Sequence, residues 1–227
     1  MTESLSWQPS LFDGAQGYSI RAIGAKDTYY FLLNIHYARR IPSISHAYGL
    51  FLDGELVGVI TYGVPPSPTL CEGICGVEYK SMVLELNRLC LLHNRPNEAS
   101  RLVAGSFKLL PQPSIIVSFA DTAQDHLGVV YQATNFLYTG LSAKRKEWAV
   151  RGMENLHSKT LSNMARDHGD GREIDNIREM FGDDFYYRER SRKHRYIMLI
   201  GNRTQRRDLR RALRYEVLPY PKEGTHD

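Results

Sequence analysis

An α+β fold is predicted by three features of the sequence. Residues 115–119 form a short apolar run that ends at Asp121, which is typical of a strand buried on both faces. Apolar residues then recur at helical spacing over residues 127–134, so a helix follows this strand at once. Asp53-Gly54 separates two other apolar runs and favours a two-residue hairpin, because both turn positions need positive φ.

The first part of the chain begins with residues 1–16, which we expect to be a flexible tail. Residues 18–23 are predicted to form the first strand. A helix is predicted from Lys26 to Arg40, because its apolar and aromatic residues share one face. The residues on that face are Tyr29, Leu32, Leu33, His36 and Tyr37.

The middle of the chain should complete the sheet. The hairpin strands cover residues 48–52 and 56–62, and the proline-rich segment 65–76 is expected to be an irregular loop. Residues 81–92 form the next strand, in which the apolar positions change phase near Asn87 and Arg88, as in a β-bulge.

Two charged residues, Glu85 and Arg88, lie in this otherwise buried strand, where an unpaired charge is costly. They could pair with each other, or Arg88 could face a cofactor or substrate. A helix after residues 93–100 should turn Leu102, Val103, Ser106, Phe107 and Leu110 inward.

The domain boundaries follow from these patterns. We expect a core over residues 17–150 and an insertion of loops and helices over residues 151–193. Residues 194–227 should return as a closing strand and a helix that Asn202 caps, with Leu209, Ala212 and Leu213 facing inward.

Composition excludes several classes of protein. With 227 residues and 42% hydrophobic content, the chain can bury a real core. No apolar run approaches the roughly 20 residues needed to span a bilayer, so we expect a cytoplasmic protein. Three cysteines make a disulfide framework improbable, and although Cys71 and Cys75 could bind a metal, reduced thiols are the better interpretation.

Positive charge is concentrated late in the chain. The formal net charge is +4, and residues 188–214 contain eleven Lys or Arg but only two acidic residues. Such a one-sided distribution predicts contact with a phosphate backbone rather than a plain solvated face. The residues proposed for that contact are Arg190, Arg192, Lys193, Arg206, Arg207, Arg210 and Arg211.

Residues 118–136 carry a resemblance to known proteins. The run Val-Tyr-Gln-Ala-Thr-Asn-Phe-Leu-Tyr-Thr-Gly over residues 130–140 resembles the end of the fourth helix of GNAT-type acyltransferases, with Asn135 where glycine is usual. The longer run Ser-Phe-Ala-Asp-Thr-Ala-Gln-Asp-His-Leu-Gly-Val-Val-Tyr-Gln-Ala-Thr-Asn-Phe over residues 118–136 resembles the signature of the phage Mom family, as does Asn-Ile-His-Tyr-Ala-Arg-Arg over residues 34–40.

This resemblance implies a GNAT-like central mixed sheet with helices on both faces. It also implies an enzyme of the host cytoplasm that attaches a carbamoylmethyl group to adenine N6 in double-stranded DNA and shields phage DNA from restriction. Two other classes stay open: an N-acetyltransferase that uses acetyl-CoA on an amine, and a non-catalytic module that binds DNA or a sliding clamp.

The resemblance also assigns roles to residues. Tyr131 would be the acid for a leaving group, Asp121 a base or a metal ligand, and Ser118 would line the same edge. Iron would be held by His36, Tyr37 and Asp121, a set of ligands that suits non-haem iron. Acetyl-CoA or a related acyl-CoA would meet Arg88, Arg95, Ser100 and Arg101 at a helix N-terminus, although the usual glycine loop is missing.

The tail contains a second short motif. Gln8-Pro-Ser-Leu-Phe12 resembles the peptide by which bacterial replication proteins dock in the sliding clamp. Its Leu11 and Phe12 are apolar anchors in a segment without a core to join, so a bacterial sliding clamp is a possible partner.

Overall fold

The computed structural model describes residues 17–156 and 158–222, and the clamp-like peptide Gln8–Phe12 lies outside them. Two compact units make up the chain. Unit 1 contains residues up to Ala120, residues 126–140 and the chain from His194, and unit 2 contains residues 121–125 and 141–193. The second part of unit 2 begins at Leu141, because the strand after Leu141 pairs within this unit.

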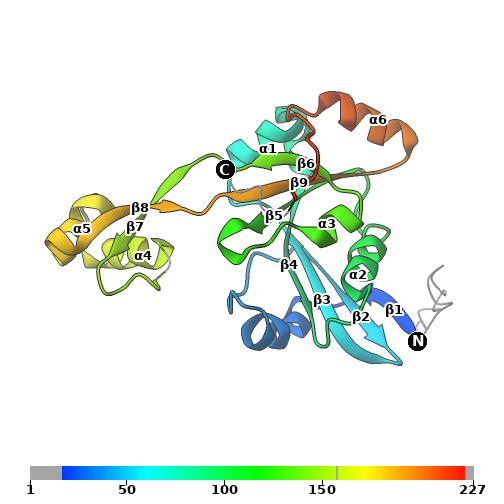
Figure 1. The fold of residues 1–227 in the computed structure, drawn as a ribbon, viewed down its shortest axis with the longest axis horizontal. Helices are drawn as coiled ribbons and strands as arrows, with labels where there is room; N and C mark the ends of the chain where they lie inside the picture. Colours follow the sequence, from blue (N-terminus) through cyan, green and yellow to red (C-terminus); the bar gives the residue numbers. More distant parts are fainter. Residues whose placement is uncertain (1–16, 157, 223–227) are drawn as a thin grey trace, which may run out of the picture. The chain divides into compact units, whose positions relative to one another are not determined.

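A mixed sheet of seven strands forms the centre of the fold, in the order β1-β2-β3-β4-β5-β9-β6 (Figure 1). Neighbours from β1 to β4 are antiparallel, and β5 is parallel to β4. This confirms the predicted α+β class and mixed sheet. The strands are β1 (Tyr18–Ala22), β2 (His46–Leu52), β3 (Glu55–Gly63), β4 (Val83–Leu91), β5 (Ser114–Asp121), β6 (Leu137–Leu141) and β9 (Lys193–Ile200).

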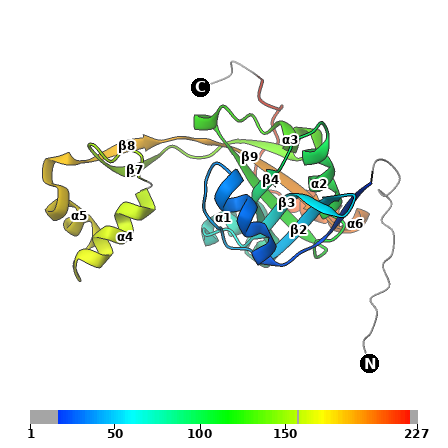
Figure 2. The ribbon, with the colours of Figure 1, turned by 90° about the horizontal axis from the view of Figure 1, so that it is seen from below.

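Helices cover both faces of this sheet, as predicted (Figure 2). Ile116 of β5 packs in one core cluster with α2 (Glu98–Ser106), and α3 (Val129–Ala133) lies against the same cluster. Its neighbours Ile115 and Val117 pack in a second cluster with α1 (Pro68–Cys75) and α6 (Arg203–Ala212). Side chains alternate between the two faces of a strand, so β5 is buried on both.

The helix predicted from Lys26 to Arg40 is much shorter. A 3-10 turn, η1 (Ala25–Thr28), is followed by a π-helical turn, η2 (Phe31–Ile35). The turn ends when the His36 N–H donates to the Phe31 carbonyl at 2.8 Å and the His36 backbone becomes extended. Leu32 is fully buried whereas Tyr37 is 63% exposed, so the predicted shared face does not exist.

The expected loop over residues 65–76 is wrong, because α1 occupies most of it. The Ser67 hydroxyl accepts a hydrogen bond from the Leu70 N–H at 3.2 Å, and Pro68 is the first helical residue. Both are favourable at a helix start, since proline there loses no hydrogen bond. The short 3-10 helix η3 (Val77–Met82) then leads into β4.

Two local predictions in the sheet are confirmed. Asp53 and Gly54, at φ of 49° and 92°, connect β2 and β3 in a tight hairpin. In β4 the register against β3 shifts so that Asn87 is the extra residue between Leu86 and Arg88. The bulge is fixed by its own side chain, because Asn87 accepts from the Thr61 hydroxyl at 2.6 Å and donates to the Ser43 carbonyl at 2.8 Å.

Unit 2 consists of a two-stranded hairpin and two helices. β7 (Arg145–Val150) pairs antiparallel with β8 (Phe185–Arg190), and α4 (Ser158–His168) and α5 (Glu173–Phe181) pack on Val150. The short turns η4 (Thr122–Gln124) and η5 (Gly182–Asp184) belong to the same unit. Among the described residues of the whole chain, no helix has the length and apolarity to cross a membrane.

Candidate functional site

Ser118 lies where β4 and β5 separate. The two strands pair over Val83–Glu85 and Ile115–Val117, and β4 then continues through the bulge. The Ser118 hydroxyl donates to the Leu86 carbonyl at 2.9 Å, and the residue is fully buried. The Ser118 side chain therefore supplies a hydrogen bond to the Leu86 carbonyl of β4, just beyond the last residue of β4 that pairs with β5. A buried carbonyl needs such a partner.

Tyr131 of α3 lies beside Ser118. Burial raises the pKa of the Tyr131 phenol, and the neighbouring Ser118 hydroxyl opposes the shift. The negative charge of Glu85 raises it further. The ring of Tyr131 packs at 5.2 Å from the rings of both Phe136 and Tyr196. Tyr131 is thus protonated at neutral pH and held in a fixed orientation, which are the properties of a general acid.

The loop before α3 depends on Gly128. At φ of 71°, a Cβ on this residue would lie 2.5 Å from a ring carbon of Tyr196 and 3.0 Å from Tyr131. Both the Tyr196 hydroxyl and the Gln132 amide donate to the Leu127 carbonyl, the amide at 3.0 Å. These contacts allow the chain to pass close to both tyrosines and fix the start of the helix.

His36 and Tyr37 follow η2 and face the same region of unit 1 as His126. The His36 and Tyr37 rings stack at 4.5 Å, and the Tyr37 ring meets the edge of His126 at 6.1 Å. Burial, the charge of Arg88 and His126 lower the pKa of His36 to about 4. His36 is therefore neutral at pH 7. Its Nδ1 accepts from the Ala38 N–H at 3.1 Å, so the ring proton is on Nε2.

Arg88 follows the bulge and has a buried donor without a partner among the described residues. Burial, followed by the charge of Arg40, lowers the pKa of the guanidinium, while Tyr37 and Glu85 raise it. Its Nη1 donates to the Asn87 carbonyl at 2.6 Å, but Nε is buried and has no hydrogen-bond partner among the described residues. A buried N–H without a partner is rare and costly, which suggests that a ligand oxygen is its partner.

The residues predicted to hold iron come from both units, since His36 and Tyr37 belong to unit 1 and Asp121 to unit 2. Among the described residues, no group of three or more His, Cys, Asp or Glu side chains is placed to hold a metal ion. The imidazole of His36 offers no lone pair, because Nδ1 accepts a hydrogen bond and Nε2 carries the proton. The three cysteines are buried and reduced, as predicted.

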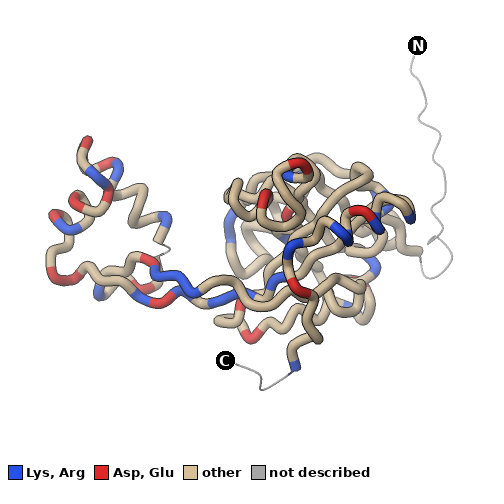
Figure 3. Tube along the Cα trace, turned by 90° about the horizontal axis from the view of Figure 1, so that it is seen from above, with Lys and Arg blue, Asp and Glu red and all other residues tan. Residues whose placement is uncertain are grey.

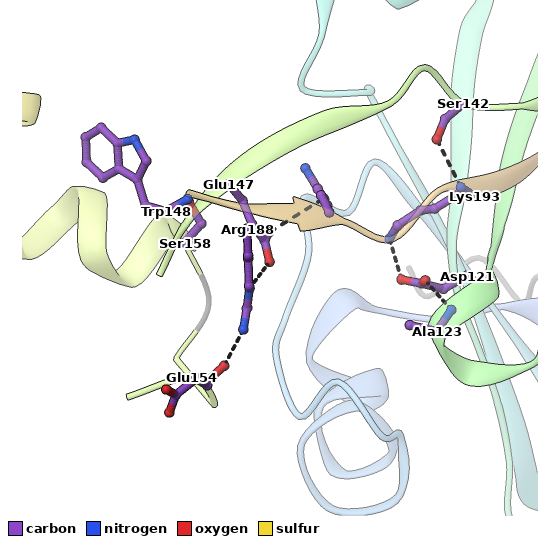
Figure 4. Close-up of polar contacts among 10 residues, drawn as sticks. Asp121, Ala123, Ser142, Glu147, Trp148, Glu154, Ser158, Arg188 and Lys193 are labelled. Carbon is purple, nitrogen blue, oxygen red and sulfur yellow. Dashed lines mark hydrogen bonds and ion pairs between the residues drawn. The ribbon is translucent and has the colours of Figure 1, made fainter. Parts of the chain in front are cut away.

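Asp121 is the last residue of β5, as predicted, and both its oxygens are engaged within unit 2 (Figure 4). Oδ1 accepts from the Ala123 N–H at 3.0 Å, and Oδ2 lies 3.2 Å from Nζ of Lys193. Burial opposes ionisation of Asp121, but hydrogen bonds from Ser191 and Ala123 and the charge of Lys193 outweigh it and lower the pKa. At neutral pH this carboxylate is ionised.

The N-terminus of α2, where an acyl-CoA pyrophosphate was predicted to bind, holds a buried carboxylate. The Glu98 side chain, only 1% exposed, accepts from the Arg95 N–H at 2.8 Å and from the Tyr18 hydroxyl at 2.8 Å. A carboxylate in this position uses a loop donor and repels a second anion. The other predicted cofactor residues have internal contacts too: the Ser100 hydroxyl donates to the Asn97 carbonyl, and Arg101 lies over the Tyr18 ring at 4.9 Å.

The basic helix predicted at the end of the chain is α6. Asn202 and Gln205 form a reciprocal capping box, Leu209 is buried, and the arginines are exposed. A separate surface cavity of about 630 Å³ lies at the β1–β2 edge of the sheet and is lined by Arg21, Asp27 and Phe51 among others. Its lining contains none of the residues of the cluster around Tyr131.

The sequence identifies the class of protein to which this chain is related. The Mom protein family matches it over residues 17–222, so the chain belongs to that family. A protein of Escherichia phage Mu named methylcarbamoylase mom is 30% identical over 193 residues, covering 82% of this chain and 76% of that protein.

Solved structures of acetyltransferases resemble the fold more distantly. A GNAT-family acetyltransferase from Bacillus cereus has a TM-score of 0.42 at 12% identity, with 81% of this chain and 97% of that chain covered. A Bacillus subtilis acetyltransferase in complex with CoA has a TM-score of 0.41 at 11% identity, with coverages of 81% and 97%. Because both TM-scores are below 0.5, we infer nothing about the chemistry of this chain from them.

Sequence reasoning missed two residues near these sites. His126, which precedes α3, was not predicted as a site residue, because a single histidine in a polar loop has no spacing that indicates a site. For Glu98 the sequence held a weak signal. It lies three residues after Arg95 at the start of a helix, where a Glu side chain commonly accepts a hydrogen bond from the backbone N–H three residues before it.

Proposed function

We propose that the chain attaches a carbamoylmethyl group to N6 of adenine in double-stranded DNA and so protects phage DNA from restriction. The observation that carries this proposal is the 30% identity to the phage Mu methylcarbamoylase over 193 residues. The polar cluster of unit 1 supports it, because a fixed phenol, a neutral imidazole and a guanidinium with a spare N–H suit group transfer better than binding alone.

The chemistry assigns a distinct task to each residue. A new bond from N6 to carbon requires N6 to lose a proton and the departing group to gain one. Tyr131, protonated at neutral pH, supplies the second proton. Arg88 Nε and His36 Nε2 donate hydrogen bonds to oxygen atoms of the donor or base. Asp121 is ionised and remains a candidate to accept the proton from N6.

The substrate must be presented as an extruded base. Adenine N6 is paired inside the duplex, so the nucleotide has to leave the stack before it can react, which costs a few kcal/mol. Phosphate contacts by basic residues stabilise such a complex without reading sequence. We assign such contacts to the exposed arginines of α6 and to basic residues of unit 2.

The test is mass spectrometry of nucleosides from DNA that has been co-expressed with the protein. We expect a mass-shifted deoxyadenosine from cells with the wild-type chain and from a Tyr30→Phe control, since Tyr30 is 63% exposed. Unmodified deoxyadenosine from folded, expressed protein would contradict the proposal. Acetylation of an amine by the purified protein with acetyl-CoA would instead support the N-acetyltransferase alternative.

A further inference from the structure

Charge is separated along unit 2. The segments 144–147 and 188–193, at one end of the β7–β8 hairpin, contain seven Lys or Arg and two Glu. Residues 151–187, at the other end, contain five Lys or Arg and eight Asp or Glu. Figure 3 shows the Lys and Arg positions following one another along the hairpin strands. A unit with little net charge of its own therefore carries a strongly basic end.

Several of these basic side chains are used within the unit. Arg188 donates to Glu147 Oε1 at 2.8 Å and to the Glu154 carbonyl at 2.7 Å (Figure 4). Arg192 donates to the Ser142 carbonyl at 2.8 Å, and Lys193 pairs with Asp121. These three residues hold the hairpin and its base together.

Four others face solvent. Lys144, Arg145, Lys146 and Arg190 are all exposed. Arg145 lies directly opposite Arg190 in the hairpin register, so the two side chains are on the same face. Two acids accompany them: Glu147 is 3.9 Å from Arg190 Nε and already bonds to Arg188, and Glu189 lies opposite Lys146 in the register. Like charges directly opposite each other destabilise a strand pair, and a bound anion removes that cost.

We propose that this basic hairpin end, formed by Lys144, Arg145, Lys146 and Arg190, binds the phosphate backbone of the double-stranded DNA substrate. The proposal rests on the proposed function, which makes DNA the substrate. Each of the two guanidinium groups can pair with a phosphate of the backbone, and Lys144 and Lys146 add positive charge at the same end of the hairpin. Phosphate contacts of this kind position a protein on DNA and do not depend on base sequence.

The experiment measures binding of the full-length chain to a short fluorescent DNA duplex at a series of salt concentrations. For Arg145→Gln/Arg190→Gln we expect a slope of log K against log salt that is smaller by about 2, because each phosphate contact contributes about 0.9. At physiological salt this corresponds to roughly 10- to 30-fold weaker binding. Arg145→Lys/Arg190→Lys should keep the wild-type slope, because lysine also neutralises a phosphate.

The matched control is Arg151→Gln/Arg178→Gln, which removes two exposed arginines from the acidic part of the same unit. We expect less than about a twofold change in binding, and thermal melts of all variants establish that they fold. A wild-type slope for Arg145→Gln/Arg190→Gln overturns the inference, as does an equal loss in the control or a wild-type chain that does not bind DNA. If the wild-type chain is an oligomer and Arg145→Gln/Arg190→Gln makes it dissociate without weakening DNA binding, the surface binds a second copy of the chain. That result overturns the inference as well.

The same preparations separate this inference from the proposed function. If the wild-type chain binds the duplex through the hairpin end but no modified deoxyadenosine is found, the proposed function fails and the binding surface stands. If modified deoxyadenosine is found and the hairpin variants bind normally, only the binding surface fails.

Discussion

The polar groups of unit 1 and the basic end of unit 2 use side chains in opposite ways. Around Tyr131, each group has fixed neighbours and burial shifts the pKa values of Tyr131, His36 and Arg88. At the hairpin end, Arg145 and Arg190 are exposed and lie beside a like charge. The groups around Tyr131 fix which individual atoms carry a proton. The hairpin end supplies positive charge, and a neighbouring basic residue can partly replace a lost one.

This difference predicts two kinds of mutational response. Loss of one group in the cluster should abolish modification without weakening DNA binding. Loss of one basic surface residue should weaken binding by a graded, salt-dependent amount. The following changes test whether the two regions respond in these separate ways.

Arg88 offers the largest expected effect of the four variants considered next. Arg88→Gln removes the buried Nε donor, and we expect about 100-fold less modified deoxyadenosine per unit time, as for removal of one donor to a developing charge. Nucleoside mass spectrometry measures this, with Arg21→Gln, an exposed arginine of β1, as the control. A comparable loss of DNA affinity would place Arg88 among the binding residues instead.

The α6 arginines should behave like the hairpin end. Arg206→Gln/Arg210→Gln is expected to weaken duplex binding roughly 10- to 30-fold at physiological salt and to lower the salt slope by about 2. Arg206→Lys/Arg210→Lys should keep the wild-type slope, because lysine also neutralises a phosphate. Unchanged binding would leave the unit 2 hairpin as the main phosphate contact and make α6 a solvated helix.

Glu98 tests whether a buried carboxylate at α2 serves the fold. Glu98→Ala leaves the Tyr18 hydroxyl and the Arg95 N–H without their acceptor, so the free energy of unfolding should fall by about 1–3 kcal/mol. Urea unfolding measures this, and Glu55→Ala on the surface should change it little. If Glu98→Ala unfolds at the wild-type urea concentration, the hydrogen bonds do not hold α2 in place.

His36 gives the smallest expected effect, on pH dependence. Its folded pKa of about 4 is below the ordinary value of 6.5, so between these values the unfolded chain binds the extra proton. The contribution of His36 to stability is therefore present above pH 6.5 and declines as pH falls toward 4. The melting temperature of wild type should fall more steeply over this range than that of His36→Gln, and parallel pH curves would contradict the assignment.

Local chemistry made part of this structure predictable. The hairpin at Asp53-Gly54 and the cap at Asn202 were visible in sequence because each depends on neighbouring residues, and the bulge at Asn87 was visible as a change of phase in the apolar positions. The start of α1 was equally local, yet the proline-rich segment 65–76 was predicted to be a loop although Ser67 and Pro68 are a good helix start.

The rest depended on distant contacts. The turn η2 ends at His36, where the backbone becomes extended and leaves Tyr37 exposed, although the aromatic spacing predicted a continued helix. Placement of β7 in the second unit depends on pairing with β8, about forty residues later. Engagement of Arg192 and Lys193 depends on Ser142 and Asp121, which no pattern in residues 188–193 reveals.

The most direct test compares modification and binding in one preparation of Tyr131→Phe, which keeps the ring packing and removes only the phenolic hydroxyl. Our account predicts wild-type affinity for duplex DNA together with at least about 100-fold less modified deoxyadenosine, the usual contribution of a general acid. Wild-type amounts of modified deoxyadenosine from Tyr131→Phe would contradict it.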